Sequence, residues 1–244
     1  MDRQGSTAPS GHLGIEVIRA AGERQILTEF GQIVGMQYPA RELSGTDVRH
    51  LGMPRKGLSA EVNAWRKANA PNLLRGLARV TAARKLKLPT FYGSLYLTLV
   101  RSSGEVVEFG LGSMRVVTTA GCNFLVDALQ GSVEPEILKY HGVGTGTTAE
   151  ASGDTALVTE STTILTVDST RATGSLTEGA SANIFRTVGT VSFDGSGAIT
   201  EHGVFSQAAT GGGTLLDRSV FSAVNVISGD QISFTYDFTI VAGS

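Results

Sequence analysis

The chain has 244 residues, of which 41% are hydrophobic and 17% charged, and its formal net charge is −2. This length suffices for one sizeable core, alone or with an appendage. The single cysteine excludes an internal disulfide, and no apolar run reaches the roughly 20 residues of a membrane-spanning helix. The polar N-terminus also lacks the apolar segment of a secretory signal.

The near-neutral total hides an uneven distribution of charge. Residues 1–90 contain 14 Lys and Arg against 7 acidic residues, a net charge of +7. Residues 91–244 contain 6 Lys and Arg against 15 acidic residues, a net charge of −9. The division predicts a basic, extended N-terminal arm with short helices over 1–90 and a separate domain over 91–244.

The predicted arm has weak helical patterns. Residues 1–14 are expected to be disordered, and the apolar spacing over 26–34 fits one face of a helix. Residues 35–57, rich in Gly and polar residues, are expected to form an irregular connector. Ser59 can cap a helix over 60–68, Pro71 is expected to interrupt it, and a second helix is predicted over 72–86.

From Tyr92 onward the apolar period changes to two, which is typical of strands. One short helix over 119–130 is predicted to cover the sheet, with Cys122 as a buried thiol. The fold class predicted is mainly β, an antiparallel β-sandwich or jelly-roll-like C-terminal domain with an extended, partly helical N-terminal arm. Strands are predicted over residues 94–100, 105–111, 114–117, 140–144, 156–159, 164–167, 184–193, 199–206, 215–220 and 231–241.

The last predicted strand alternates most regularly. One face carries large apolar residues, and the other carries the polar residues Ser233, Thr235, Asp237 and Thr239. This pattern predicts a half-buried strand in which Asp237 faces water and Phe234 and Phe238 face the core.

The sequence indicates no catalytic, cofactor-binding or metal-binding residues, and we expect the protein not to be an enzyme. No two of its four histidines have a metal-ligand spacing, and Glu201 and His202 should point to opposite faces of a strand. The glycine cluster at 142–146 is expected to be a loop between strands, since no helix follows it to bind phosphate. A glycosidase-type pair of carboxylates remains a distant alternative, because such residues need only converge in space.

The basic segment 49–87 holds ten Lys and Arg and only one acidic residue. Phosphate contacts with nucleic acid, docking on an acidic protein surface, and the solvated face of ordinary helices all remain open, and we favour protein docking. The residues expected to make protein contacts are Arg55, Lys56, Trp65, Arg66, Lys67, Arg75 and Arg79.

Several phrases over about residues 118–242 resemble structural proteins of tailed-bacteriophage virions. They are HGVGTGTTA at 141–149, DTAL at 154–157, ITEHGVFS at 199–206 and GTLLDRSVF at 213–221. The resemblance implies a virion component, made in the host cytoplasm, without catalytic residues. A capsid decoration or cement protein is the function we expect, and a neck, tail or tail-fibre component is the alternative.

We expect the protein to bind copies of itself, as a trimer, and the major capsid protein or other virion proteins. The opposite charges of the predicted arm and domain allow one copy's arm to lie on its neighbour. Membrane binding is not expected, and nucleic acid is the less favoured partner of the basic segment.

Overall fold

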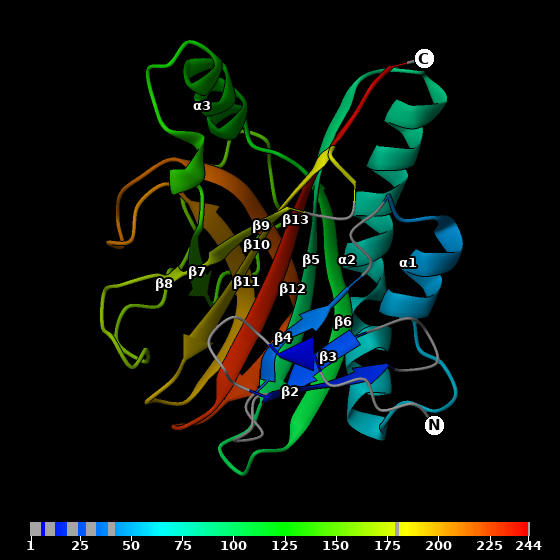
Figure 1. The fold of residues 1–244 in the computed structure, drawn as a ribbon, viewed down its shortest axis with the longest axis vertical. Coiled ribbons are helices and arrows are strands. Elements are labelled where there is room, and N and C mark those ends of the chain that lie inside the picture. Colours follow the sequence, from blue (N-terminus) through cyan, green and yellow to red (C-terminus); the bar gives the residue numbers. More distant parts are fainter. Residues whose placement is uncertain are drawn as a thin grey trace.

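The structure, a computed structural model, describes residues 6–7, 13–18, 24–27, 33–38, 42–178 and 181–243. Over these residues the protein is mainly β, with two antiparallel sheets forming its body and three α-helices (Figure 1). The prediction of a mainly β, antiparallel protein is thus confirmed. Among the described residues, every helix is too short or too polar to span a membrane.

The first sheet has five strands in the order β6-β5-β13-β10-β9. Its long central strand, β13, pairs along its whole length with β5 on one side and over residues 231–239 with β10 on the other. The strands are β5 (Thr90–Val100), β6 (Val106–Val116), β9 (Ser175–Glu178), β10 (Ile184–Ser192) and β13 (Gln231–Val241).

The second sheet has four strands in the order β12-β11-β7-β8. Both sheets contribute to one apolar cluster, in which Leu97 and Phe234 of the first sheet meet Val204 and Phe221 of the second. The strands are β7 (Tyr140–Gly144), β8 (Ala172–Thr173), β11 (Gly197–Phe205) and β12 (Leu215–Val226).

The outer face of the first sheet is covered as well. Helices α1 (Gly45–Gly52) and α2 (Ala60–Lys85) lie over its β6 side, and a second cluster joins Leu51 and Leu73 of the helices to Tyr96 of β5. Tyr38 stacks on Tyr96, and its carbonyl accepts from Arg186 of β10, beside β13. The prediction of a half-buried last strand is therefore wrong, because Asp237 is buried together with its polar neighbours on β13. Alternation along a strand shows that two faces differ, but it cannot show what lies against the polar one.

Helix α2 is continuous, so the two helices predicted on either side of Pro71 are one. Proline removes one backbone hydrogen bond, but bonds to β6 hold the helix on both sides of it, from Arg66 to the Phe109 carbonyl and from Arg115 to the Asn72 carbonyl. Asn69, expected as a stop, is buried; its Nδ2 donates to the Gly112 carbonyl at 2.7 Å, and its Oδ1 accepts from the Ser222 amide at 3.0 Å. These two bonds join the helix to β6 and β12.

The described part of residues 1–90 does not form an extended arm. Val62 and Trp65 of α2 belong to the core cluster between the sheets, so the helix is part of the folded body. Helix α1, which the connector prediction missed, starts with a capping box in which the Ser44 side chain and the Asp47 carboxylate each accept from the other's backbone amide.

The predicted helix over 26–34 is also wrong where the structure describes it. Ile26 and Leu27 lie in β3 and Ile33 and Val34 in β4, strands of a four-stranded sheet in the order β1-β2-β3-β4. β-branched residues favour strands over helices, which explains the error. Residues 28–32, and most of the predicted disordered segment 1–14, lie outside the described ranges. The strand bounds are β1 Ser6–Thr7, β2 Leu13–Ile18, β3 Arg24–Leu27 and β4 Ile33–Gln37.

Helix α3 (Thr119–Leu129) confirms the predicted covering helix, and Gly131 follows it with φ of +71°. The 3-10 helix η1 (Pro135–Ile137) comes next. The strands predicted over 156–159 and 164–167 are wrong, since only single bridges, Gly144 to Glu160 and Leu165 to Phe193, form there.

Candidate functional site

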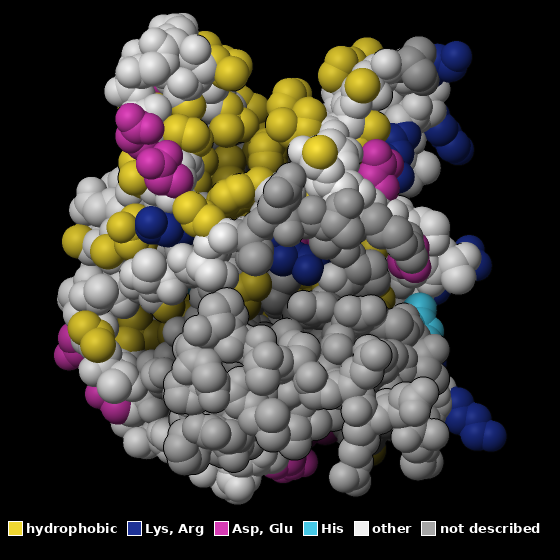
Figure 2. Space-filling view, viewed as in Figure 1, with side chains coloured by type: hydrophobic (Ala, Val, Ile, Leu, Met, Phe, Trp, Pro, Cys, Tyr) yellow, Lys and Arg dark blue, Asp and Glu magenta, His cyan; other side chains and the backbone are white. Residues whose placement is uncertain are grey.

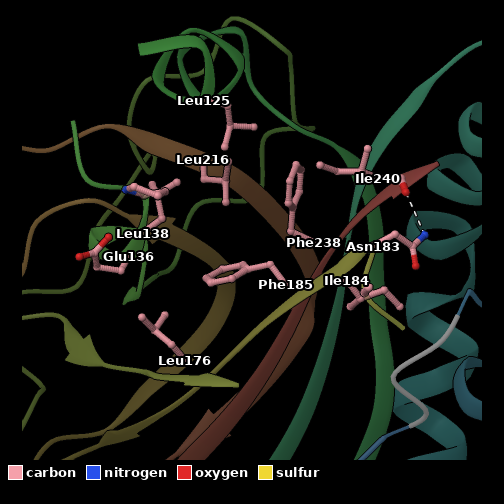
Figure 3. Close-up of a pocket in the computed structure, with 12 residues that line it drawn as sticks. Leu125, Glu136, Leu138, Leu176, Asn183, Ile184, Phe185, Leu216, Phe238 and Ile240 are labelled. Carbon is pink, nitrogen blue, oxygen red and sulfur yellow. Dashed lines mark hydrogen bonds between the residues drawn. The ribbon is translucent and has the colours of Figure 1, made fainter. Parts of the chain in front are cut away.

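An apolar groove of about 540 Å³ lies between α3, η1 and the ends of β9, β10 and β13. In Figure 3 the side chains of Leu125, Leu138, Phe185 and Phe238 lie around this space, and Leu216 closes it from the second sheet. The groove is lined by Leu125, Pro135, Glu136, Leu138, Leu176, Ala182, Asn183, Ile184, Phe185, Leu216, Phe238 and Ile240.

Helix α3 contributes Leu125 to the groove and uses only part of its apolar surface to cover the sheet. Thr118 caps the helix and Phe124 is buried beneath it, which fixes its position. Val126 and Leu129 nevertheless stay exposed, and Leu129 keeps 90% of its surface accessible. Cys122 is exposed as well, contrary to the prediction of a buried thiol. Helix α3 has more apolar residues than its buried face can cover. This excess is visible in the sequence and indicates the exposed apolar surface of the helix.

The chemistry of the groove suits an apolar group of a partner. The Asn183 side chain is already engaged, because its Nδ2 donates to the Ile240 carbonyl at 2.9 Å. Glu136 is an exposed residue of the lining, and Glu134 and Asp127 are exposed nearby in sequence. The lining therefore offers apolar contact with an acidic rim. Within the described ranges, no three His, Cys, Asp or Glu side chains converge as metal ligands do.

The predicted contact residues divide into two groups. Lys56, Lys67, Arg75 and Arg79 are exposed, and Arg55 is half-buried with its Nε donating to the His50 carbonyl at 3.2 Å. The four exposed residues are available to a partner, as the prediction requires.

Trp65 and Arg66 are buried, so their predicted role in contacts with a partner is wrong. The Trp65 ring lies 4.8 Å from Phe109, and its Nε1 donates to the Ser222 carbonyl at 2.7 Å. The Arg66 guanidinium donates to the carbonyls of Phe109 and His50 at 2.8 and 2.9 Å. A basic residue in a helix can thus serve as an internal clamp on neighbouring backbone, and charge counting does not reveal this.

Two histidines that are far apart in sequence meet in the core. His141 Nδ1 lies 2.9 Å from His202 Nε2, and His141 Nε2 lies 3.1 Å from Thr187 Oγ1. Burial lowers the pKa of His141 to about 3 and also lowers that of His202, which the neighbouring His141 lowers further. Both rings are therefore neutral, one supplying a proton and the other a lone pair.

These histidines predict that acid destabilises the protein. Their folded pKa values lie below the unfolded value of 6.5, so stability is lost as the pH falls through 6.5. Burial raises the pKa of Asp217 to about 7, and this group opposes the loss between pH 7 and its ordinary value of 3.8. Below about pH 5.5, where both unfolded histidines are protonated, two histidines against one aspartate give a net loss of about 1.4 kcal/mol per pH unit.

Denaturant unfolding at pH 7, 6 and 5 measures this loss. Asp217→Asn should steepen the dependence to about 2.7 kcal/mol per pH unit, because only the histidines remain. A His141→Gln/His202→Gln variant with the wild-type slope would show that other groups cause the acid sensitivity.

Glu201 is the centre of a second buried network. Its carboxylate accepts the amides of Gly146, Val158 and Thr159 at 3.0, 3.1 and 2.8 Å, and the Arg218 Nε at 2.8 Å. The glycine cluster at 142–146 therefore begins in β7 and continues into a loop held by this carboxylate. Gly144 and Gly146 lie where an added Cβ would collide with the Glu201 side chain, which explains the glycines without a phosphate.

Comparisons of the chain with protein-family models, with curated proteins and with solved structures find no match. Its function is therefore inferred from its own residues and contacts.

Proposed function

We propose that this protein is a structural component of a tailed-bacteriophage virion that binds and stabilises the capsid as a decoration or cement protein. The observation that carries the proposal is the apolar groove beside α3, an exposed surface suited to protein contact. The phrases that resemble virion proteins contribute His141 and Glu201 to the buried networks, which is a structural use of these residues.

We further propose that the two sheets form a β-sandwich, since residues of both meet in one core. The hairpins β5–β6, β9–β10 and β11–β12 each lie within one sheet. This connectivity supports a sandwich more directly than a jelly-roll.

The exposed basic face of α2 is the second surface that supports attachment. Lys67, Arg75 and Arg79 lie on it, and an acidic partner surface would attract them. We expect reversal of all three to Glu to weaken binding to particles at least tenfold at low salt, and less at high salt where charges are screened. The measurement is cosedimentation of purified protein with particles that lack it, at two salt concentrations.

A matched control keeps the charge of this face. Arg75→Lys/Arg79→Lys should bind as the wild type does, because the partner would sense charge and not guanidinium geometry. Point substitutions are preferred to deletion of residues 1–90, since deletion would uncover Tyr92 and Tyr96 on the outer face of the first sheet. Unchanged binding of the triple Glu variant would remove α2 from the attachment surface.

The copy number per particle separates the two virion roles. Hundreds of copies indicate a lattice protein of the head, whereas a handful indicates the neck or tail.

A further inference from the structure

The end of α2 carries two leucines that the fold leaves exposed. We name residues 85–88 the α2 end. Leu86 and Leu88 are 70% and 52% exposed, and Lys85 and Lys87 are exposed beside them. The amides of Lys87 and Leu88 donate to the carbonyls of Arg84 and Ala83, which stops the helix. Lys87 has φ of +58°, in the left-handed region that favours glycine.

The α2 end and the groove lie at the same end of the molecule. Strand β5 begins at Thr90, directly after the α2 end, and Phe91 pairs with Ile240 of the groove. The rings of Phe91 and Phe238 stack with their centres 6.2 Å apart, so apolar surface continues from the groove toward α2. In Figure 1, α3 and the last turns of α2 stand on either side of this end, and Figure 2 shows hydrophobic side chains in the hollow between them.

The two surfaces have opposite charge. Residues 79–88 hold four cations and no carboxylate. Residues 119–139, which form α3 and η1, hold three carboxylates and one lysine. Figure 2 shows acidic side chains on the α3 side and basic ones on the α2 side of the hollow. The acidic Glu42 is already paired with Arg84 at 2.9 Å.

We propose that the groove binds the α2 end of a second copy of this chain, and that the contact is reciprocal. The apolar Leu86 and Leu88 match the groove lining, while Lys85 and Lys87 meet the carboxylates of Glu134 and Glu136. Since each copy carries both surfaces at one end, a two-fold axis satisfies both contacts at once. The inference rests on the proposed function, because both assume that the groove binds protein. It favours a two-fold dimer over the trimer expected from the sequence.

Charge reversal tests the contact in the full-length purified chain. Lys85→Glu/Lys87→Glu and Glu134→Lys/Glu136→Lys should each raise the dissociation constant of the dimer at least tenfold, measured by analytical ultracentrifugation at low salt. A 1:1 mixture of the two variants should restore dimers, because each α2 end then meets a groove of opposite charge. A monomeric wild type, a trimer, or a mixture that stays monomeric would overturn the proposal.

A second pair of variants tests the apolar part. Leu86→Ser/Leu88→Ser should weaken the dimer at least tenfold with an unchanged melting temperature, since these leucines are exposed. Leu74→Ser is the matched control, because Leu74 is 50% exposed on the same helix, away from its end, and its loss should leave the dimer intact. Equal dissociation constants for the dimers of the wild type, Leu86→Ser/Leu88→Ser and Leu74→Ser would overturn the proposal.

The two proposals fail in different ways. If the purified chain is a monomer but still binds particles, only the reciprocal contact is wrong. If it forms the dimer but binds no particle, the virion role is wrong and the contact between copies stands.

Discussion

Replacing Asp237 with alanine is expected to lower the free energy of unfolding by about 3–5 kcal/mol, as much as Phe234→Ala. The Asp237 carboxylate accepts from Arg186 Nε at 2.6 Å and Nη2 at 2.7 Å, and both residues are buried. Alanine would leave the guanidinium charged and buried, with the Tyr38 carbonyl, 2.9 Å from its Nη1, as its remaining acceptor among the described residues. Burial raises the pKa of Asp237, and Arg186 offsets part of the rise, so the guanidinium stabilises the charged carboxylate.

Denaturant unfolding followed by the fluorescence of the single tryptophan, Trp65, measures the effect. The double variant Arg186→Met/Asp237→Leu is the control, and it should cost far less than Asp237→Ala because no unpaired charge remains. A cost of less than 1 kcal/mol for Asp237→Ala, of the size seen at solvated positions, would mean that the outer face of the first sheet is open to water.

Replacing Glu201 with alanine is expected to cost at least about 4 kcal/mol, because it removes the acceptor of three backbone amides and of Arg218 together. The side chains of Glu201 and Arg218 are 0% and 1% exposed, so water cannot replace these bonds without opening the sheet. The loop that Glu201 holds should lose order first. Hydrogen exchange of the amides of Gly146, Val158 and Thr159 should therefore accelerate more than exchange in β13.

Asp154 provides the matched control for this network. Its carboxylate also pairs with Arg218, at 3.0 Å, but its side chain is 22% exposed. Asp154→Ala should cost only about 1–2 kcal/mol, because water reaches the site it vacates. Equal costs for the two variants would show that the bond to Arg218, and not the three amides, is what Glu201 contributes.

The sequence predicts the strands and the helix between residues 90 and 244 well where local signals are strong. The sequence alone shows the alternation over 231–241 and the turn residues on both sides of it. It also shows the Thr118 cap of α3. The strands over 156–159 and 164–167 were mispredicted because apolar residues there anchor a loop. Leu157 and Leu165 are buried without a strand partner on each side.

The candidate site can be predicted from the sequence only in part. The excess of apolar residues over 119–130 is a local signal, and the basic character of α2 is another. The groove itself needs Leu176, Phe185 and Phe238 from three strands that only the sheet order brings together. Likewise, Arg66 and Arg75 look alike in sequence, yet one lies under α1 and β6 and the other in solvent.

The mainly β class, the antiparallel pairing and the charge of each half follow from the amino-acid sequence, because period, turn residues and composition act over short distances. Which faces of the sheets are covered depends on contacts between segments far apart in the chain. Tyr38, which follows β4, stacks on Tyr96 and accepts from Arg186, so the polar face of β13 beside them is part of the interior. The meeting of His141 with His202 and of Arg218 with Glu201 followed from strand order and register. Burial changes the energetic role of a charge or an imidazole completely, and burial depends on segments far away in the chain.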